Sequence, residues 1–172
     1  YSLVGLFGTA DKWISFFFFF ALNLATYTYF GQAFISLVKD VNTAGALVGA
    51  LIGFNVFFSG LVVQPQYLTG PFQLGYWTAP GRYAYEGIIT SQFLDLPYKV
   101  IAEPLGPFYY SLGCADPDVE CSGTMEEYVD FFFGGRFKAR YSGLDIGVLF
   151  FCLFLARLLL WLALWKLNYV NT

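Results

Sequence analysis

The chain offers few side chains that could do covalent chemistry. It has no histidine among its 172 residues, which excludes Ser-His and Cys-His nucleophilic sites and imidazole metal sites. None of its lysines is followed by serine or threonine, as a phosphate-binding loop requires. We therefore expect no catalytic residue, no metal site and no cofactor in this chain, and no nucleotide-binding domain.

Three charged side chains deserve a structural interpretation. Asp145 is the only carboxylate inside one of the long apolar segments, at its edge, whereas intramembrane aspartyl proteolysis needs two carboxylates. We interpret Asp145 as a first-turn acid that the helix dipole favours. Arg82 and Glu86 are four residues apart, which predicts an ion pair on a short helix. Pro80 fits the first turn of that helix, with Thr78 as its predicted cap.

Uncharged polar groups interrupt the second apolar segment. Asn55 and Ser59 lie on one helical stripe, beside Phe54. Buried amides in lipid need partners or a water-lined cavity. Two interpretations remain open, namely hydrogen bonds between helices or a substrate path lined by Phe54, Asn55 and Ser59.

Three glycines in the same segment repeat every four residues, at Gly45, Gly49 and Gly53. Small residues at this spacing allow two helix backbones to approach closely in lipid. The spacing predicts a packing seam, either with a neighbouring helix of the same chain or with a second copy of the domain.

Two of the three cysteines, Cys114 and Cys121, lie in a polar stretch. Such a pair favours an oxidising compartment. We expect a disulfide there, with an intrachain bond and an intermolecular bond as the alternatives.

The elements that must position these residues are membrane helices. The chain is 58% hydrophobic and only 12% charged, against about 25% charged residues in soluble domains. Residues 13–38, 41–63 and 144–167 are each long enough to cross a bilayer. Residues 64–93 are aromatic but broken by prolines, which predicts a re-entrant or interfacial segment. Residues 94–143 form a large hydrophilic loop, with a short helix near 125–133.

These patterns predict an all-α, multi-pass transmembrane domain with a re-entrant helical segment and a large loop. The positions of lysine and arginine near the segment ends do not decide its orientation. A net charge of −3 without a clustered basic face excludes nucleic acid as a partner.

Several short motifs follow one another along the chain. The first apolar segment, which carries several polar residues, leads by a tight turn into the glycine-rich one. The motifs are then Phe-Phe-Ser-Gly-Leu-Val-Val (57–63), Ala-Pro-Gly-Arg-Tyr-Ala-Tyr-Glu-Gly (79–87), Ser-Gln-Phe-Leu (91–94), Cys-Ser-Gly-Thr-Met-Glu-Glu-Tyr (121–128) and Leu-Asn-Tyr (167–169). This ordered set resembles the C-terminal half of the membrane domain of G-subfamily ATP-binding cassette exporters, the white and pleiotropic-drug-resistance type.

The resemblance covers nearly all of residues 1–172 and implies one partial membrane domain. Residues 1–8 match the end of a third span, and the three long segments match the fourth to sixth spans. The polar loop, 94–143, is then external and the C-terminus is cytosolic, in what we expect to be the plasma membrane. Leu61 and Val62 match a bulky pair that forms the outer gate.

The resemblance also implies partners and a function. The expected partners are membrane lipid, a second membrane domain and a nucleotide-binding domain that carries ATP and Mg²⁺ elsewhere in the parent protein. The expected function is the permease part of an ATP-driven exporter of lipids, sterols or amphipathic xenobiotics. A channel or secondary carrier, or a structural membrane assembly protein, is the alternative.

Overall fold

The computed structural model describes residues 9–38, 40–94, 96–114, 116 and 120–166. The predicted span end at 1–8 and the C-terminal residues beyond 166 lie outside the described residues. Three long apolar helices dominate the fold, and each is long enough to cross a membrane. They are α1 (Ala10–Leu37), α2 (Val41–Phe58) and α7 (Ser142–Lys166). The predicted all-α membrane domain is confirmed, apart from one short two-stranded ribbon.

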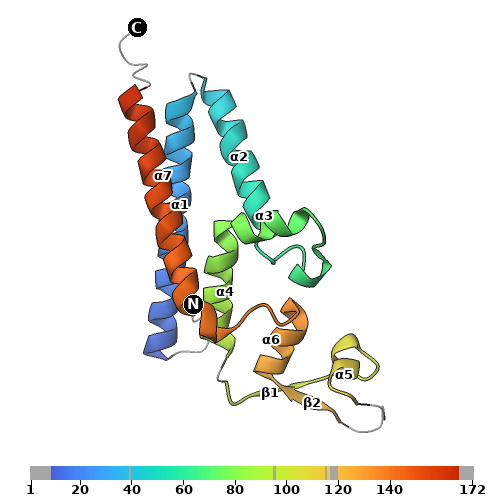
Figure 1. Ribbon diagram of the computed structural model, residues 1–172. Helices are drawn as coiled ribbons and strands as arrows, with labels where there is room; N and C mark the ends of the chain where they lie inside the picture. Colours follow the sequence, from blue (N-terminus) through green and yellow to red (C-terminus); the bar gives the residue numbers. More distant parts are fainter. Residues whose placement is uncertain (1–8, 39, 95, 115, 117–119, 167–172) are drawn as a thin grey trace.

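The three long helices run side by side, with α1 against both α7 and α2 (Figure 1). The connection from α1 to α2 and the C-terminal end of α7 lie at one end of the molecule, and the loop region lies at the other. Arg157 is the one cation in the middle of α7, and its Nη1 donates a hydrogen bond to the Tyr29 hydroxyl of α1 at 2.5 Å. Most apolar side chains on these helices are exposed, as lipid-facing residues are.

Helix α2 ends at Phe58, rather than at Val63 as the apolar pattern predicted. The chain turns at Gly60, whose φ of +89° is a left-handed conformation that glycine adopts without strain. The Ser59 hydroxyl donates to the Val56 carbonyl and accepts the backbone N–H of Leu61. Leu61 to Val63 therefore lie in the connection that follows the helix.

The proline-broken segment forms three short helices: η2 (Pro65–Tyr67), α3 (Phe72–Thr78) and α4 (Pro80–Phe93). Pro80 begins α4 as predicted, but the predicted Thr78 cap is wrong. Thr78 is the last residue of α3, and its hydroxyl donates to the Leu74 carbonyl at 2.8 Å. A β-hydroxyl this close to a carbonyl one turn back is satisfied within its own helix.

Helix α4 packs against both α1 and α7 at the end of the molecule near the loop (Figure 1). Gly87 permits this approach, because a Cβ there would overlap the Phe19 ring of α1. At the end of α4, Gln92 Nε2 donates to the Lys12 carbonyl at 2.7 Å, and Lys12 Nζ donates to the Leu94 carbonyl at 3.0 Å. These reciprocal bonds tie the end of α4 to the start of α1.

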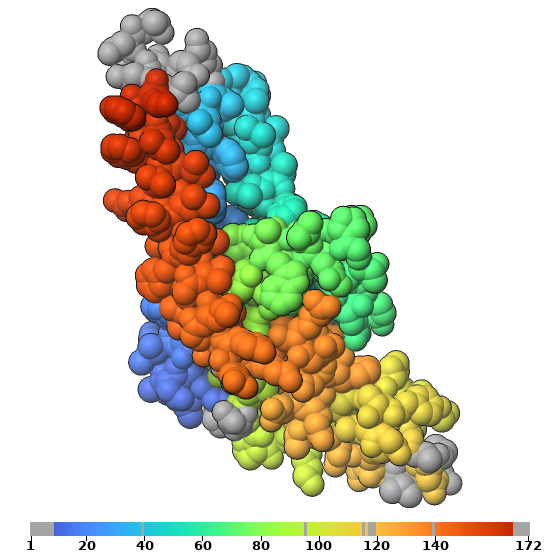
Figure 2. Space-filling model, viewed as in Figure 1, coloured from blue at the N-terminus to red at the C-terminus, as the bar shows by residue number. Residues whose placement is uncertain are grey.

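The loop region has its own small core. Strand β1 (Lys99–Ile101) pairs antiparallel with β2 (Ser122–Thr124). Helix α5 (Pro107–Ser111) and helix α6 (Met125–Phe133) pack on this ribbon, and η3 (Ala139–Tyr141) leads into α7. The predicted helix near 125–133 is confirmed, with Thr124 and Glu127 forming a capping box. Figure 2 shows the loop region projecting from one end of the helices.

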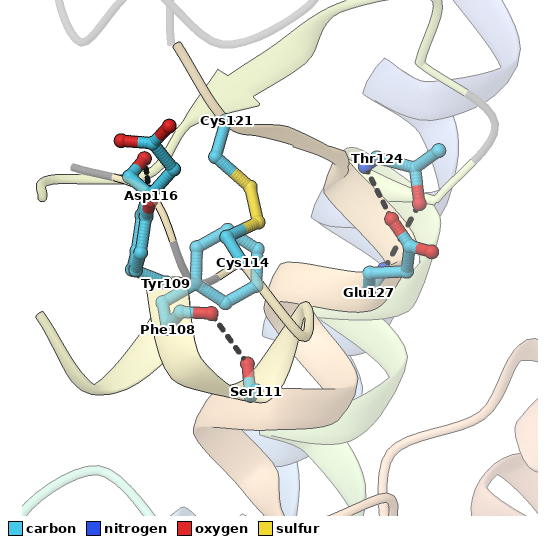
Figure 3. Close-up of a disulfide and its surroundings, with 8 residues drawn as sticks. All are labelled: Phe108, Tyr109, Ser111, Cys114, Asp116, Cys121, Thr124 and Glu127. Carbon is cyan, nitrogen blue, oxygen red and sulfur yellow. Dashed lines mark hydrogen bonds between the residues drawn. A yellow bond between two sulfur atoms is a disulfide. The ribbon is translucent and has the colours of Figure 1, made fainter. Parts of the chain in front are cut away.

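A disulfide joins Cys114 to Cys121, with Cα atoms 6.6 Å apart. It links the segment after α5 to the chain just before β2 (Figure 3). The Tyr109 hydroxyl donates to the Asp116 carbonyl beside it. The structure thus has the intrachain form of the bond expected for this pair.

Candidate functional site

A cavity of about 310 Å³ lies between α1, α2 and α4. Its walls are mostly apolar, with a few polar groups from each of the three helices. The lining residues are Asn23, Tyr27, Ile52, Asn55, Val56, Ser59, Leu61, Gly81, Ala84, Tyr85 and Ile88. A mixed lining of this kind is typical of sites for small amphipathic molecules.

Asn55 positions two of these helices against each other. Its side chain is buried, and its Oδ1 accepts the backbone N–H of Gly81 at 2.8 Å. Gly81 is the second residue of α4, so an amide of α2 satisfies one of the free N–H groups at the start of α4. A Cβ at Gly81 would overlap the Asn55 side chain, so this bond requires glycine.

Several polar atoms around the cavity are unsatisfied. Within the part of the chain that the structure describes, Asn23 Oδ1, Tyr27 Oη and Asn55 Nδ2 are buried without a hydrogen-bond partner. Buried polar atoms are almost always paired with protein, water or ligand. The three side chains line the cavity, but these three atoms themselves are covered by the surrounding chain in this conformation.

Two of the other residues predicted for the path and the gate line the cavity, and two do not. Ser59 lines the cavity, whereas Phe54 lies outside its lining and packs its ring against Phe58 at 4.7 Å between centroids. Leu61 lines the cavity and Val62 does not, and both side chains are more than half exposed. The structure therefore brings Asn55, Ser59 and Leu61 together.

The glycine face of α2 is open. A Cβ at Gly45, Gly49 or Gly53 would meet nothing within 4 Å among the described residues. Helix α1 approaches α2 elsewhere, where Val48 comes within 4.0 Å of a Cβ built at Gly31. The three glycines thus make no close packing contact with another described segment of this chain.

Arg82 and Glu86 form a buried ion pair on α4, with Nη2 and Oε2 2.9 Å apart. The guanidinium also lies over the ring of Trp77 at 4.1 Å and over those of Tyr76 and Tyr83 at 4.6 Å. Cation–π contacts of this kind are strongest when the cation is desolvated. Glu86 Oε1 accepts the backbone N–H of Lys138 at 3.2 Å. Burial raises the pKa of the Glu86 carboxyl, against the opposing effects of Arg82 and of this hydrogen bond.

Asp145 joins this charged group, which sequence reasoning missed. It lies in the first turn of α7 as predicted, but its side chain is buried and neither carboxyl oxygen has a hydrogen-bond partner. The sequence contains no local sign of this placement, because Asp145 is 59 residues from Glu86 and the two meet only through the packing of α4 on α7.

Two glycines of α4 were also missed. Gly81 and Gly87 are six residues apart, so they do not share a face of the helix, and each serves a different neighbour. A glycine in a helix interior lowers the stability of the helix. Its presence in the predicted helix could therefore have indicated that a neighbouring segment packs closely there. Tyr27, which is four residues after Asn23 on α1, was also missed, and both line the cavity together with Asn55.

Comparison with known proteins decides the family. A sequence profile described as ABC-2 type transporter matches residues 1–93, which is more than half of the chain and includes α1 to α4. The chain belongs to the ABC-2 type transporter family. The matched region contains every residue that lines the cavity.

Relatives of this ABC-2 domain carry G-subfamily names, which confirms the predicted resemblance. The chain is 28% identical to ABC transporter G family member 35 of Arabidopsis thaliana over 149 residues, 87% of the chain and 9% of that protein. It is 28% identical to G family member 53 of Oryza sativa over 96 residues, 56% of the chain and 7% of that protein. It is 29% identical to ABC multidrug transporter MDR1 of Trichophyton interdigitale over 108 residues, 63% of the chain and 7% of that protein.

The chain thus spans less than a tenth of the length of these relatives. No solved structure matches it significantly. The three apolar helices and the family together establish an integral membrane domain of a transporter.

Proposed function

We propose that this ABC-2 domain forms part of the substrate pathway of an ATP-driven exporter of lipids, sterols or amphipathic xenobiotics. The observation that carries the proposal is the cavity between α1, α2 and α4. Its mostly apolar walls suit a greasy molecule, and the polar residues among them, Asn23, Tyr27, Asn55 and Ser59, suit a polar group on it. The multidrug name of one relative agrees with this substrate class.

The outer gate is proposed at the end of α2. Leu61 lines the cavity and Val62 follows it directly, in the connection that turns at Gly60. Two exposed bulky side chains at the mouth of an apolar cavity would close it against water when a facing surface packs on them. This pair would then separate the cavity from the outside between transport events.

The facing surface is proposed to be a second membrane domain, from another chain or from another part of the same protein. The open face at Gly45, Gly49 and Gly53 would admit a close helix contact. ATP and Mg²⁺ would bind a nucleotide-binding domain of the same protein or of a partner chain.

The proposed orientation places the loop region outside and the C-terminus in the cytosol, in the plasma membrane. The disulfide between Cys114 and Cys121 supports this side, because disulfides persist in oxidising surroundings. The loop region and the C-terminal end of α7 lie at opposite ends of the molecule (Figure 1).

The pathway is tested by filling the cavity in the full-length protein. Ile52 lines the cavity, whereas Leu47 is exposed on the same helix outside it. Ile52→Trp should reduce export of a fluorescent amphipath and its stimulation of ATP hydrolysis by at least about tenfold, as a loss of about 1.4 kcal/mol in binding would produce. Leu47→Trp also introduces a tryptophan, but outside the cavity. At equal surface expression it should leave the export of the amphipath and the stimulation of ATP hydrolysis unchanged.

Equal export by the Ile52→Trp and Leu47→Trp proteins would contradict the proposal. Export that stays normal in the Ile52→Trp protein for every amphipath, at normal surface expression, would place the pathway elsewhere in the transporter.

A further inference from the structure

Three buried charged side chains lie on α4 and α7, which pack against each other, and the carboxyl of Asp145 interacts electrostatically with Glu86 and Arg82. Arg82 is 3% exposed, Glu86 is 0% exposed and Asp145 is 1% exposed. Arg82 Nη2 pairs with Glu86 Oε2, and Glu86 Oε1 accepts the Lys138 N–H. Both Asp145 oxygens remain without a partner, as do Arg82 Nε and Nη1.

The charges of this group do not balance. It contains one guanidinium and two carboxylates, so two ionised acids would leave one negative charge in excess. The other groups nearby do not supply a buried positive charge that would compensate it. From α3, Tyr76 brings a neutral hydroxyl, and Arg136 lies on the Tyr76 ring at 5.7 Å and is partly exposed to solvent.

The remaining neighbours contribute no compensating charge either. Lys138, in the connection before α7, gives only its backbone N–H, because its side chain is exposed. On α1, the ammonium of Lys12 donates to the carbonyls of Gln92 and Leu94, at the far end of α4. Arg140 of η3, which packs against both helices, has an exposed side chain. Among the described residues, the buried charged group therefore consists of Arg82, Glu86 and Asp145.

An isolated buried carboxylate is strongly unfavourable, and such a group takes up a proton instead of remaining charged. The unpartnered atoms are already covered by this chain, so neither lipid nor another segment of the protein can reach them in this conformation. We propose that Glu86 and Asp145 together bind one proton between α4 and α7. The site is independent of the substrate pathway proposed above, because none of the three side chains lines that cavity.

A consequence concerns the motion of α7. The proton is held because the contact between α4 and α7 excludes water from Asp145. A conformation that separates these helices and hydrates Asp145 would release the proton, because a solvated carboxyl ionises near pH 4. The conformation described here is therefore the proton-bound one.

Infrared spectroscopy of the full-length transporter at pH 7 tests the proposal directly. The wild-type protein should show the carbonyl stretch of a protonated carboxylic acid, with its shift in deuterium oxide. Asp145→Asn and Glu86→Gln should each abolish this band, because either change leaves one carboxylate to pair with Arg82. Glu126→Gln, at an exposed acid of the loop region, should retain it. A wild-type protein without the band, or a band that persists in both Asp145→Asn and Glu86→Gln, would overturn the proposal.

Thermal unfolding as a function of pH provides a second readout. The folded protein holds this proton, and the unfolded protein releases it above about pH 4. The free energy of unfolding should therefore fall as the pH rises from about 4 to the pH at which the folded site also releases the proton. The midpoint of Asp145→Asn should therefore exceed that of wild type by an amount that grows with pH. A constant difference from pH 5 to pH 8 would count against a proton. A wild-type midpoint that depends on sodium rather than choline chloride would assign the site to a metal cation instead.

Discussion

At the residue scale, Asn55 connects helix packing to the cavity. Its Oδ1 accepts the N–H of Gly81 at the start of α4, and the residue also lines the cavity. Asn55→Ala should lower the free energy of unfolding by about 1–2 kcal/mol, because it leaves the partly buried Gly81 N–H without its partner. Ser59→Ala should cost less, since the Ser59 hydroxyl bonds to the backbone of Val56 and Leu61, both within three residues of it, and links no second helix. Thermal unfolding of the purified transporter compares them, and equal losses would argue against the link between α2 and α4.

The proposed gate gives a second prediction at this scale. Replacing both Leu61 and Val62 with alanine should lower the barrier between the cavity and the outside. We expect ATP hydrolysis to become less tightly coupled to export, with surface expression retained because both side chains are exposed. Transport and hydrolysis measured on the same vesicles would show it. Unchanged coupling in the double variant would remove the gate from these two positions.

At the scale of elements, the close approach of α4 to α1 depends on Gly87. Gly87→Ala should cost about 1–3 kcal/mol, because the new methyl group overlaps the Phe19 ring. Gly147→Ala on α7 meets nothing within 4 Å and should be neutral or slightly stabilising. Adding Phe19→Leu to Gly87→Ala should recover part of the loss, as contacting residues couple. Additive losses in the double variant would show that the two residues do not interact.

The sequence predicted the long helices well because length and apolarity alone determine a span. It also predicted the pairing of Arg82 with Glu86 and the helix after Thr124, since both depend on neighbours within one turn. It missed the end of α2, where Gly60 and Ser59 stop the helix while apolar residues continue. It missed the hydrogen bond from Gly81 at the start of α4 to Asn55, because Asn55 belongs to α2. It missed the burial of Asp145, because α4 packs on the helix that carries it.

At the scale of the whole molecule, the open glycine face of α2 predicts a contact with a second membrane domain. Gly49→Leu should separate the two domains and abolish both association and transport, because a bulky side chain prevents close backbone approach. Leu47→Trp enlarges a different face of α2 and should be tolerated. Cysteine cross-linking along residues 45–60 in the membrane measures the geometry. An unchanged cross-linking pattern in the Gly49→Leu protein would place the contact elsewhere.

The central claim is that the transported molecule passes through the cavity between α1, α2 and α4. Its most direct test is protection of a cysteine at position 52, compared with one at position 47, in a full-length protein without other reactive thiols. The transported amphipath should slow alkylation of Ile52→Cys by a membrane-permeable maleimide and leave that of Leu47→Cys unchanged. Equal alkylation rates of Ile52→Cys with and without saturating substrate would contradict the claim.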